Sequence, residues 1–146
     1  WPTARAKRGP RARRSPTRQA DMSEVVPIMR IGDTLLISLQ GDLDDTTVLR
    51  IEDQLTREVA RTQATGTLID VSGLTMVDSF IARVITRIVG MIRLLGSQAA
   101  VVGIQPAVAI TLVELGVPMG HLDTALNAEQ GMALLRRLRD YGDRAD

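Results

Sequence analysis

The chain has no cysteine and almost no aromatic residues. The absence of cysteine from 146 residues excludes a disulfide framework and any thiolate-bound metal site. It favours a reducing compartment, so we expect a cytoplasmic protein. Aromatic residues make up 2% of the sequence, and Phe80 is the only one that lies away from the two ends. Domains that stack nucleic-acid bases on aromatic side chains are therefore disfavoured, and the core must be built from aliphatic residues and methionine.

Signals for membrane insertion and for nucleotide binding are also missing. No run free of charge and glycine reaches the length that spans a membrane, and no apolar stretch follows the N-terminal charges as in a secretory signal. Neither Gly-x-x-x-x-Gly-Lys nor Gly-x-Gly-x-x-Gly follows a predicted strand. The scattered residues Gly90, Gly96 and Gly103 are predicted to be packing or helix-end glycines. We therefore expect no membrane contact, no nucleotide cradle and no cofactor.

The charge is divided unevenly along the chain. Residues 1–21 carry seven basic residues against one acidic residue, include three prolines and show no apolar periodicity. They are predicted to be a disordered basic extension, either an arm for nucleic acid or membranes or, as we favour, a non-native addition ahead of Met22. Residues 22–146 carry 11 basic and 16 acidic residues, so this part should not bind nucleic acid through its charge.

Residues 22–146 have the pattern of one α/β domain, in which strands come first and strand–helix alternation follows. Apolar residues that recur every three or four positions, such as those between Val48 and Val59, predict amphipathic helices. The later crossovers imply parallel strand pairing, which gives a mixed sheet with helices packed mainly on one face. The predicted strands are 28–31, 34–40, 67–71, 99–102 and 122–125, and the predicted helices are about 45–61, 78–95, 106–115 and 128–139.

Catalytic and metal sites find little support. Ser79 lacks the Gly-x-Ser-x-Gly elbow of a hydrolase, and His121, the only histidine, is the one possible triad base and is predicted to lie on a loop. Asp42, Asp44 and Asp45 cluster without the spacing of a calcium loop. They form either a solvated loop that caps the next helix or, as we favour, the charged rim of a partner site. We expect no catalytic residue, no metal site and no enzymatic activity.

Two short polar motifs stand at predicted element ends. Ser72-Gly73 follows a buried strand, and Asp78-Ser79 precedes a helix. Functional residues in open α/β folds gather at the carboxyl ends of strands. From position alone, however, the simpler interpretation is that Asp78 or Ser79 is the N-cap of that helix.

The run Asp70-Val-Ser-Gly followed by Asp78-Ser79 resembles the signature of the STAS domain, the anti-sigma-factor antagonist family. Residues 78–83 and 103–116 are similar to the RsbS-type members of that family. The resemblance covers about residues 25–139 and implies a STAS-type fold for the domain. Phe80-Ile81 stand where sporulation-type antagonists usually have a small residue and glycine, which favours the stressosome type.

This resemblance implies that Ser79 is a phosphoacceptor. RsbS-type proteins form the stressosome, a large self-associated complex, with RsbR-type paralogues. They sequester an RsbT-type switch kinase, which phosphorylates the serine, is released and activates a downstream enzyme in the stress response; an RsbX-type phosphatase resets the site. The alternatives are a sporulation-type antagonist that binds an anti-sigma factor directly and a small nucleotide-binding STAS module. Phe80 is either ordinary core or an exposed contact. The expected partner-binding residues are Asp42, Asp44, Asp45, Asp78, Phe80 and Ile81.

Overall fold

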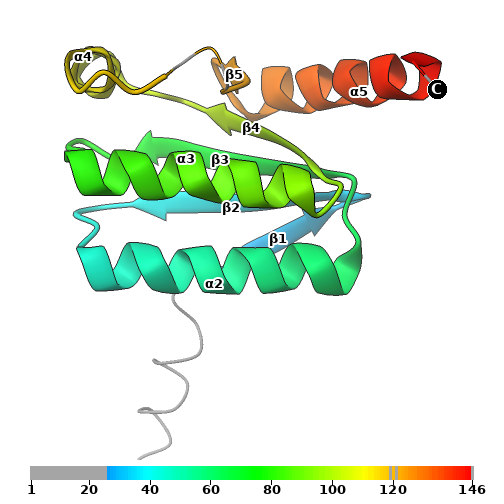
Figure 1. The fold of residues 1–146 in the computed structure, drawn as a ribbon, viewed down its shortest axis with the longest axis horizontal. Helices are drawn as coiled ribbons and strands as arrows, with labels where there is room; N and C mark the ends of the chain where they lie inside the picture. The colour runs from blue at the N-terminus through cyan, green and yellow to red at the C-terminus, as the bar shows by residue number, and fades with distance from the viewer. Residues whose placement is uncertain (1–25, 119, 121, 146) are drawn as a thin grey trace, which may run out of the picture.

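The computed structural model describes residues 26–118, 120 and 122–145. The predicted extension at residues 1–21 and the predicted loop position of His121 lie outside the described residues. The strands form one sheet in the order β1-β2-β3-β4-β5 (Figure 1). The first pair is antiparallel and the other three pairs are parallel, so the predicted mixed sheet is confirmed. The strands are β1 (Ile28–Ile31), β2 (Thr34–Gln40), β3 (Gly66–Gly73), β4 (Gln98–Val102) and β5 (Thr124–Ala125).

Three helices contribute to the larger core, on one face of the sheet. α2 (Asp45–Thr62) and α3 (Ser79–Leu94) lie side by side across it (Figure 1), and α4 (Pro106–Glu114) adds Val108 and Leu112 to the same cluster of buried residues. Helix α2 buries the apolar stripe that the sequence spacing predicted, because every third or fourth residue of the helix faces the strands. The buried residues of this stripe are Val48, Ile51, Leu55 and Val59.

The fourth helix, α5 (Ala128–Ala145), covers the opposite face through a separate small core. It approaches the sheet closely at Gly131, where a Cβ atom would lie 2.6 Å from Val102 Cγ1 and 2.8 Å from a Leu68 methyl carbon. A glycine inside a helix costs stability, but here it lets the helix backbone approach the strands. The prediction of helices mainly on one face is therefore confirmed, with α5 as the exception.

Three element boundaries differ from the sequence prediction by two residues or more. Strand β3 continues to Gly73 and not to Val71, since Gly73 still pairs with Gln40 across an irregularity in the β2–β3 register. Strand β5 has two residues instead of four. Helix α5 continues to Ala145, beyond the predicted end at residue 139.

The parallel arrangement brings the ends of several elements to one edge. Strands β2, β3 and β4 end on the left of Figure 1, where α2 and α3 begin. The loop after β2 is tied there to the end of β3 by a backbone hydrogen bond of 3.2 Å from Gly41 N to Gly73 O. The motifs that the sequence singled out, Ser72-Gly73 and Asp78-Ser79, both belong to this edge, which is termed the switch edge below.

Candidate functional site

Ser79 is the first residue of α3 and is exposed to solvent at the switch edge. Its hydroxyl makes no hydrogen bond to any residue that the structure describes. Its carbonyl oxygen accepts a hydrogen bond of 3.3 Å from Arg83 Nε, one turn further along the helix. The serine hydroxyl is therefore accessible to a modifying enzyme, while its backbone is held in the helix.

The N-cap of α3 is Asp78 and not Ser79. Asp78 has the extended backbone of a cap, with φ −91° and ψ 177°, and its Oδ1 accepts from Ile81 N at 2.8 Å. The interpretation of Ser79 as a cap is therefore wrong, because Ser79 is already the first residue of the helix and the capping hydrogen bond goes to Asp78. Capping does not occupy the Ser79 hydroxyl, so the carboxylate and the hydroxyl have separate tasks.

Asp44 has the same place in α2 that Asp78 has in α3. Its Oδ1 accepts from Thr47 N at 2.6 Å, and this hydrogen bond, helped by the nearby charge of Arg50, lowers the pKa of Asp44. Asp45 follows as the acidic residue of the first helical turn, where a negative charge is favoured. For these two residues, the structure supports the helix-capping interpretation of the acidic cluster.

Asp42 has a different environment. It lies in the loop after β2 and shares a surface hollow with Asp78, from the loop after β3. Ile81 is only 3% exposed and forms part of the floor, whereas Met76 is 78% exposed. The predicted contact residues Asp42, Asp78 and Ile81 thus come together, but Ile81 offers a partner only a buried floor. The hollow is lined by Asp42, Leu43, Met76, Val77, Asp78 and Ile81.

Phe80 is half-buried and packs against the larger core. The interpretation of Phe80 as a core residue at the start of α3 is therefore favoured, and only part of its side chain remains open to solvent. The exposed apolar side chain of this edge is Met76, from the loop before the helix.

A set of polar contacts fixes the end of β3 that carries the Asp-Val-Ser-Gly motif. Asp70 Oδ1 accepts from Ser72 N at 2.9 Å, and Gln105 Nε2 donates to Ser72 O at 2.5 Å. Gly103 has φ +76°, and a Cβ there would lie 2.9 Å from Ser72 Cβ. The motif therefore ties the end of β3 to the loop after β4. Sequence reasoning assigned no role to Gln105, although it lies within the stretch that carries the family resemblance.

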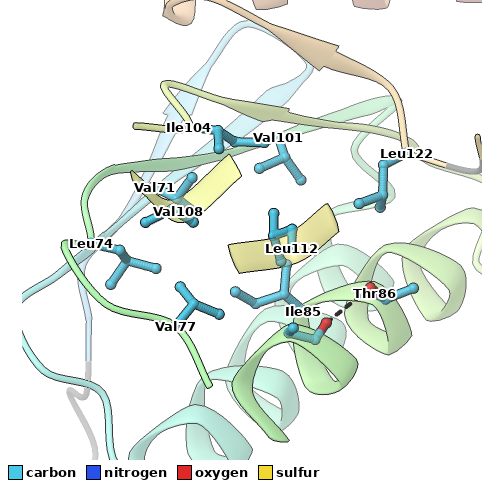
Figure 2. A pocket seen from close by; sticks show the side chains of 11 residues that line it. Val71, Leu74, Val77, Ile85, Thr86, Val101, Ile104, Val108, Leu112 and Leu122 are labelled. Carbon is cyan, nitrogen blue, oxygen red and sulfur yellow. Dashed lines mark hydrogen bonds between the residues drawn. The ribbon is translucent and has the colours of Figure 1, made fainter. Parts of the chain in front are cut away.

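An apolar pocket lies beneath the switch edge, between α3, α4 and the sheet (Figure 2). Val77 reaches it from the loop before Ser79, and Leu112 reaches it from α4. Its interior has room for about 20 Å³, enough for roughly one water molecule. Its one polar side chain, Thr86, donates its hydroxyl proton to Ala82 O (Figure 2). A nucleotide needs a much larger and more polar space, so this pocket gives no support to the nucleotide-binding alternative.

The described part of the chain contains neither a membrane-spanning helix nor a metal-binding cluster. Within residues 26–118, 120 and 122–145, no helix is both long enough and apolar enough to cross a membrane. Over the same residues, no three side chains of histidine, aspartate or glutamate gather in a way that could hold a metal ion.

The sequence model of the STAS domain matches residues 26–122, which include every element from β1 to the loop before β5. The chain belongs to the STAS domain family. This confirms the resemblance drawn from residues 70–79 to the anti-sigma-factor antagonists. The five-stranded sheet with its helices is also the fold of solved STAS structures.

Among these, the STAS domain is similar to a serine-to-glutamate variant of RsbS from Moorella thermoacetica, with 35% identity and a TM-score of 0.71. The match covers 79% of this chain and 97% of that one. A chain from a structure of the stressosome, described as a signal integration and transduction hub, is also 35% identical, with a TM-score of 0.69 and coverage of 77% and 98%. The anti-sigma factor antagonist SpoIIAA, at 16% identity and a TM-score of 0.62, shares the fold alone.

Curated relatives come from Bacillus subtilis. The RsbT co-antagonist protein RsbRB is 29% identical over 99 residues, which are 68% of this chain and 36% of that protein. The RsbT co-antagonist protein RsbRA is 26% identical over 115 residues, or 78% of this chain and 42% of that protein. The chain therefore spans less than half the length of these relatives.

Proposed function

We propose that this STAS domain is a phosphorylation-controlled scaffold of a stressosome, without catalytic activity of its own. In this proposal it sequesters an RsbT-type switch kinase in the cytoplasm and releases it when Ser79 is phosphorylated. The released kinase activates a downstream enzyme in the stress response, and an RsbX-type phosphatase restores the serine.

One observation carries the proposal: Ser79 is an exposed hydroxyl at the switch edge, directly after the aspartate that caps α3. A kinase can reach it without unfolding the helix, because Asp78 rather than Ser79 provides the cap. The 35% identity to RsbS and to a stressosome chain supports the type of assembly. The name of the relatives, RsbT co-antagonist, supports the type of kinase.

The charge at the switch edge explains how a phosphate could act. Phosphorylation adds about 1.5–2 negative charges, next to Asp78 and near the hollow that Asp42 also lines. A dianion about 6 Å from one carboxylate is repelled by roughly 1.5–5 kcal/mol, depending on the local dielectric. The exposed phosphate stays hydrated in the free domain, but a docked kinase would bury it, and burying an unpaired charge is costly. Phosphorylation therefore weakens the complex while the domain stays folded.

The direct test is incubation with a purified RsbT-type kinase and ATP, followed by mass mapping of the phosphate. We expect modification at Ser79 and none in Ser79→Ala. Thr75, exposed in the loop before α3, and Thr111 on α4 serve as internal controls. Modification at Thr75 or Thr111 with Ser79 unmodified would overturn the proposal.

A second measurement separates the scaffold from the alternatives. The chain is mixed with the kinase and an RsbR-type paralogue and passed over a sizing column. We expect a large particle that retains the kinase and loses it when Ser79 is phosphorylated. A one-to-one complex with an anti-sigma factor and no particle would favour the sporulation-type antagonist. A thermal shift with GTP would favour the nucleotide-binding module.

A further inference from the structure

Arg83 is placed against the residue that the proposed function modifies. Its Nε donates to Ser79 O at 3.3 Å, so the guanidinium group turns back along α3 toward the switch edge. Its side chain is exposed, and among the described residues it forms no ion pair with any carboxylate. Arg87, one turn further on, is by contrast engaged by both oxygens of Glu52, with Nε–Oε2 at 2.6 Å.

The spacing and chemistry of Arg83 suit a phosphate on Ser79. Residues four apart on a helix are neighbours on its surface. A guanidinium group presents several N–H donors in a planar fork that matches phosphate oxygens, and its contact with the Ser79 carbonyl uses only one of them. The two terminal nitrogens of the same group make no hydrogen bond or ion pair with a described residue, so they remain available to a phosphate on Ser79.

We propose that Arg83 is the intramolecular partner of the phosphate on Ser79, an inference that rests on the proposed function. The phosphate oxygens accept hydrogen bonds from the terminal nitrogens of Arg83, which draws the phosphate to the flank of α3. Phosphorylation then changes the switch edge at two side chains, because it adds an anion at Ser79 and withdraws the free cation of Arg83 from a docked partner.

The test measures the second pKa of the phosphate by ³¹P NMR titration of the full chain, with phosphoserine inserted at position 79 during translation. This pKa is ordinarily about 6. One positive charge about 5 Å away in water-like surroundings should lower it by roughly 0.5 unit. We expect the pKa in the unsubstituted chain to lie about 0.5 unit below that in Arg83→Gln, with Arg83→Lys between them because lysine keeps the charge without the fork.

Arg87→Gln is the matched control, since it removes the same charge one turn further from Ser79 and from a side chain already paired with Glu52. We expect it to shift the phosphate pKa by less than about 0.2 unit. The inference would be overturned if the phosphate pKa were the same in the unsubstituted chain and in Arg83→Gln. It would also be overturned if Arg87→Gln raised the phosphate pKa as much as Arg83→Gln does. Because translation supplies the phosphoserine, the result is independent of the kinase assay, in which failure to modify Ser79 would overturn the proposed function instead.

Discussion

Replacing Asp78 with alanine removes both the side chain that caps α3 and its negative charge, and comparison with Asp78→Asn separates these two roles. Asp78 Oδ1 accepts from Ile81 N at 2.8 Å, and the loss of such a cap costs about 0.5–2 kcal/mol. Removing the negative charge from the helix start adds about 0.3–1 kcal/mol. We expect Asp78→Ala to lower the free energy of unfolding by about 1–3 kcal/mol. Asp78→Asn keeps the acceptor and should cost less than about 1 kcal/mol.

This difference is measured by urea unfolding followed by far-UV circular dichroism. Tryptophan fluorescence is unsuitable, because the tryptophan of the chain is at position 1, outside the STAS domain. Asp44→Ala is the matched control, since Asp44 caps α2 with the same geometry. We expect Asp44→Ala and Asp78→Ala to be similarly destabilised. If Asp78→Ala unfolded at the same urea concentration as the unsubstituted chain while Asp44→Ala did not, Asp78 would not be the cap.

The asparagine variant then tests the electrostatic role of Asp78. It retains the cap but leaves the phosphate on Ser79 with one carboxylate fewer beside it. Repulsion of about 1.4 kcal/mol corresponds to a tenfold change in affinity. We therefore expect phosphorylation to weaken kinase binding about tenfold less in Asp78→Asn than in the unsubstituted chain. An undiminished effect of phosphorylation, measured by calorimetry, would show that charge repulsion from Asp78 is not part of the switch.

Two further predictions concern pH and packing. The hydrogen bond from the Thr47 N–H lowers the pKa of Asp44 below its ordinary 3.8. The contribution of Asp44 to stability is therefore present above pH 3.8 and is lost as the pH falls through the lowered pKa. Urea midpoints should show that Asp44→Asn loses less stability than the unsubstituted chain between about pH 5 and pH 2. Gly90→Ala should raise stability by up to about 1 kcal/mol because its surroundings are open, whereas Gly131→Ala should lower it by about 1–3 kcal/mol because the new Cβ would meet Val102. Equal effects of the two alanines in urea unfolding would contradict the close approach of α5.

The strands and helices of the larger core were predictable because their signals are local. The turn at Gly32, which has φ +59°, separates two apolar runs that pair as β1 and β2. The buried stripe of α2 follows from spacing alone. The end of α5 was not predictable in this way, because Gly142 is a common helix-ending residue, yet the helix continues through it to Ala145.

The switch edge was predictable in its location and not in its details. Strand–helix alternation places Ser72 and Ser79 at one edge, but Asp78 and Ser79 are both good capping residues, and only the path of the chain into α3 assigns the cap to Asp78. The bond from Gln105 to Ser72 joins residues 33 positions apart. Such contacts depend on how β3 and β4 are set side by side, which no local pattern encodes.

The starts of α2 and α3 can be compared position by position. In each, an aspartate with an extended backbone caps the helix, and the next residue opens it: Asp45 in α2 and Ser79 in α3. The first helix thus has a carboxyl side chain where the second has a hydroxyl. A phosphoserine at Ser79 would give α3 a negative charge at the position where α2 already has Asp45. The fold therefore already accommodates, one strand away, the charge arrangement that phosphorylation would create.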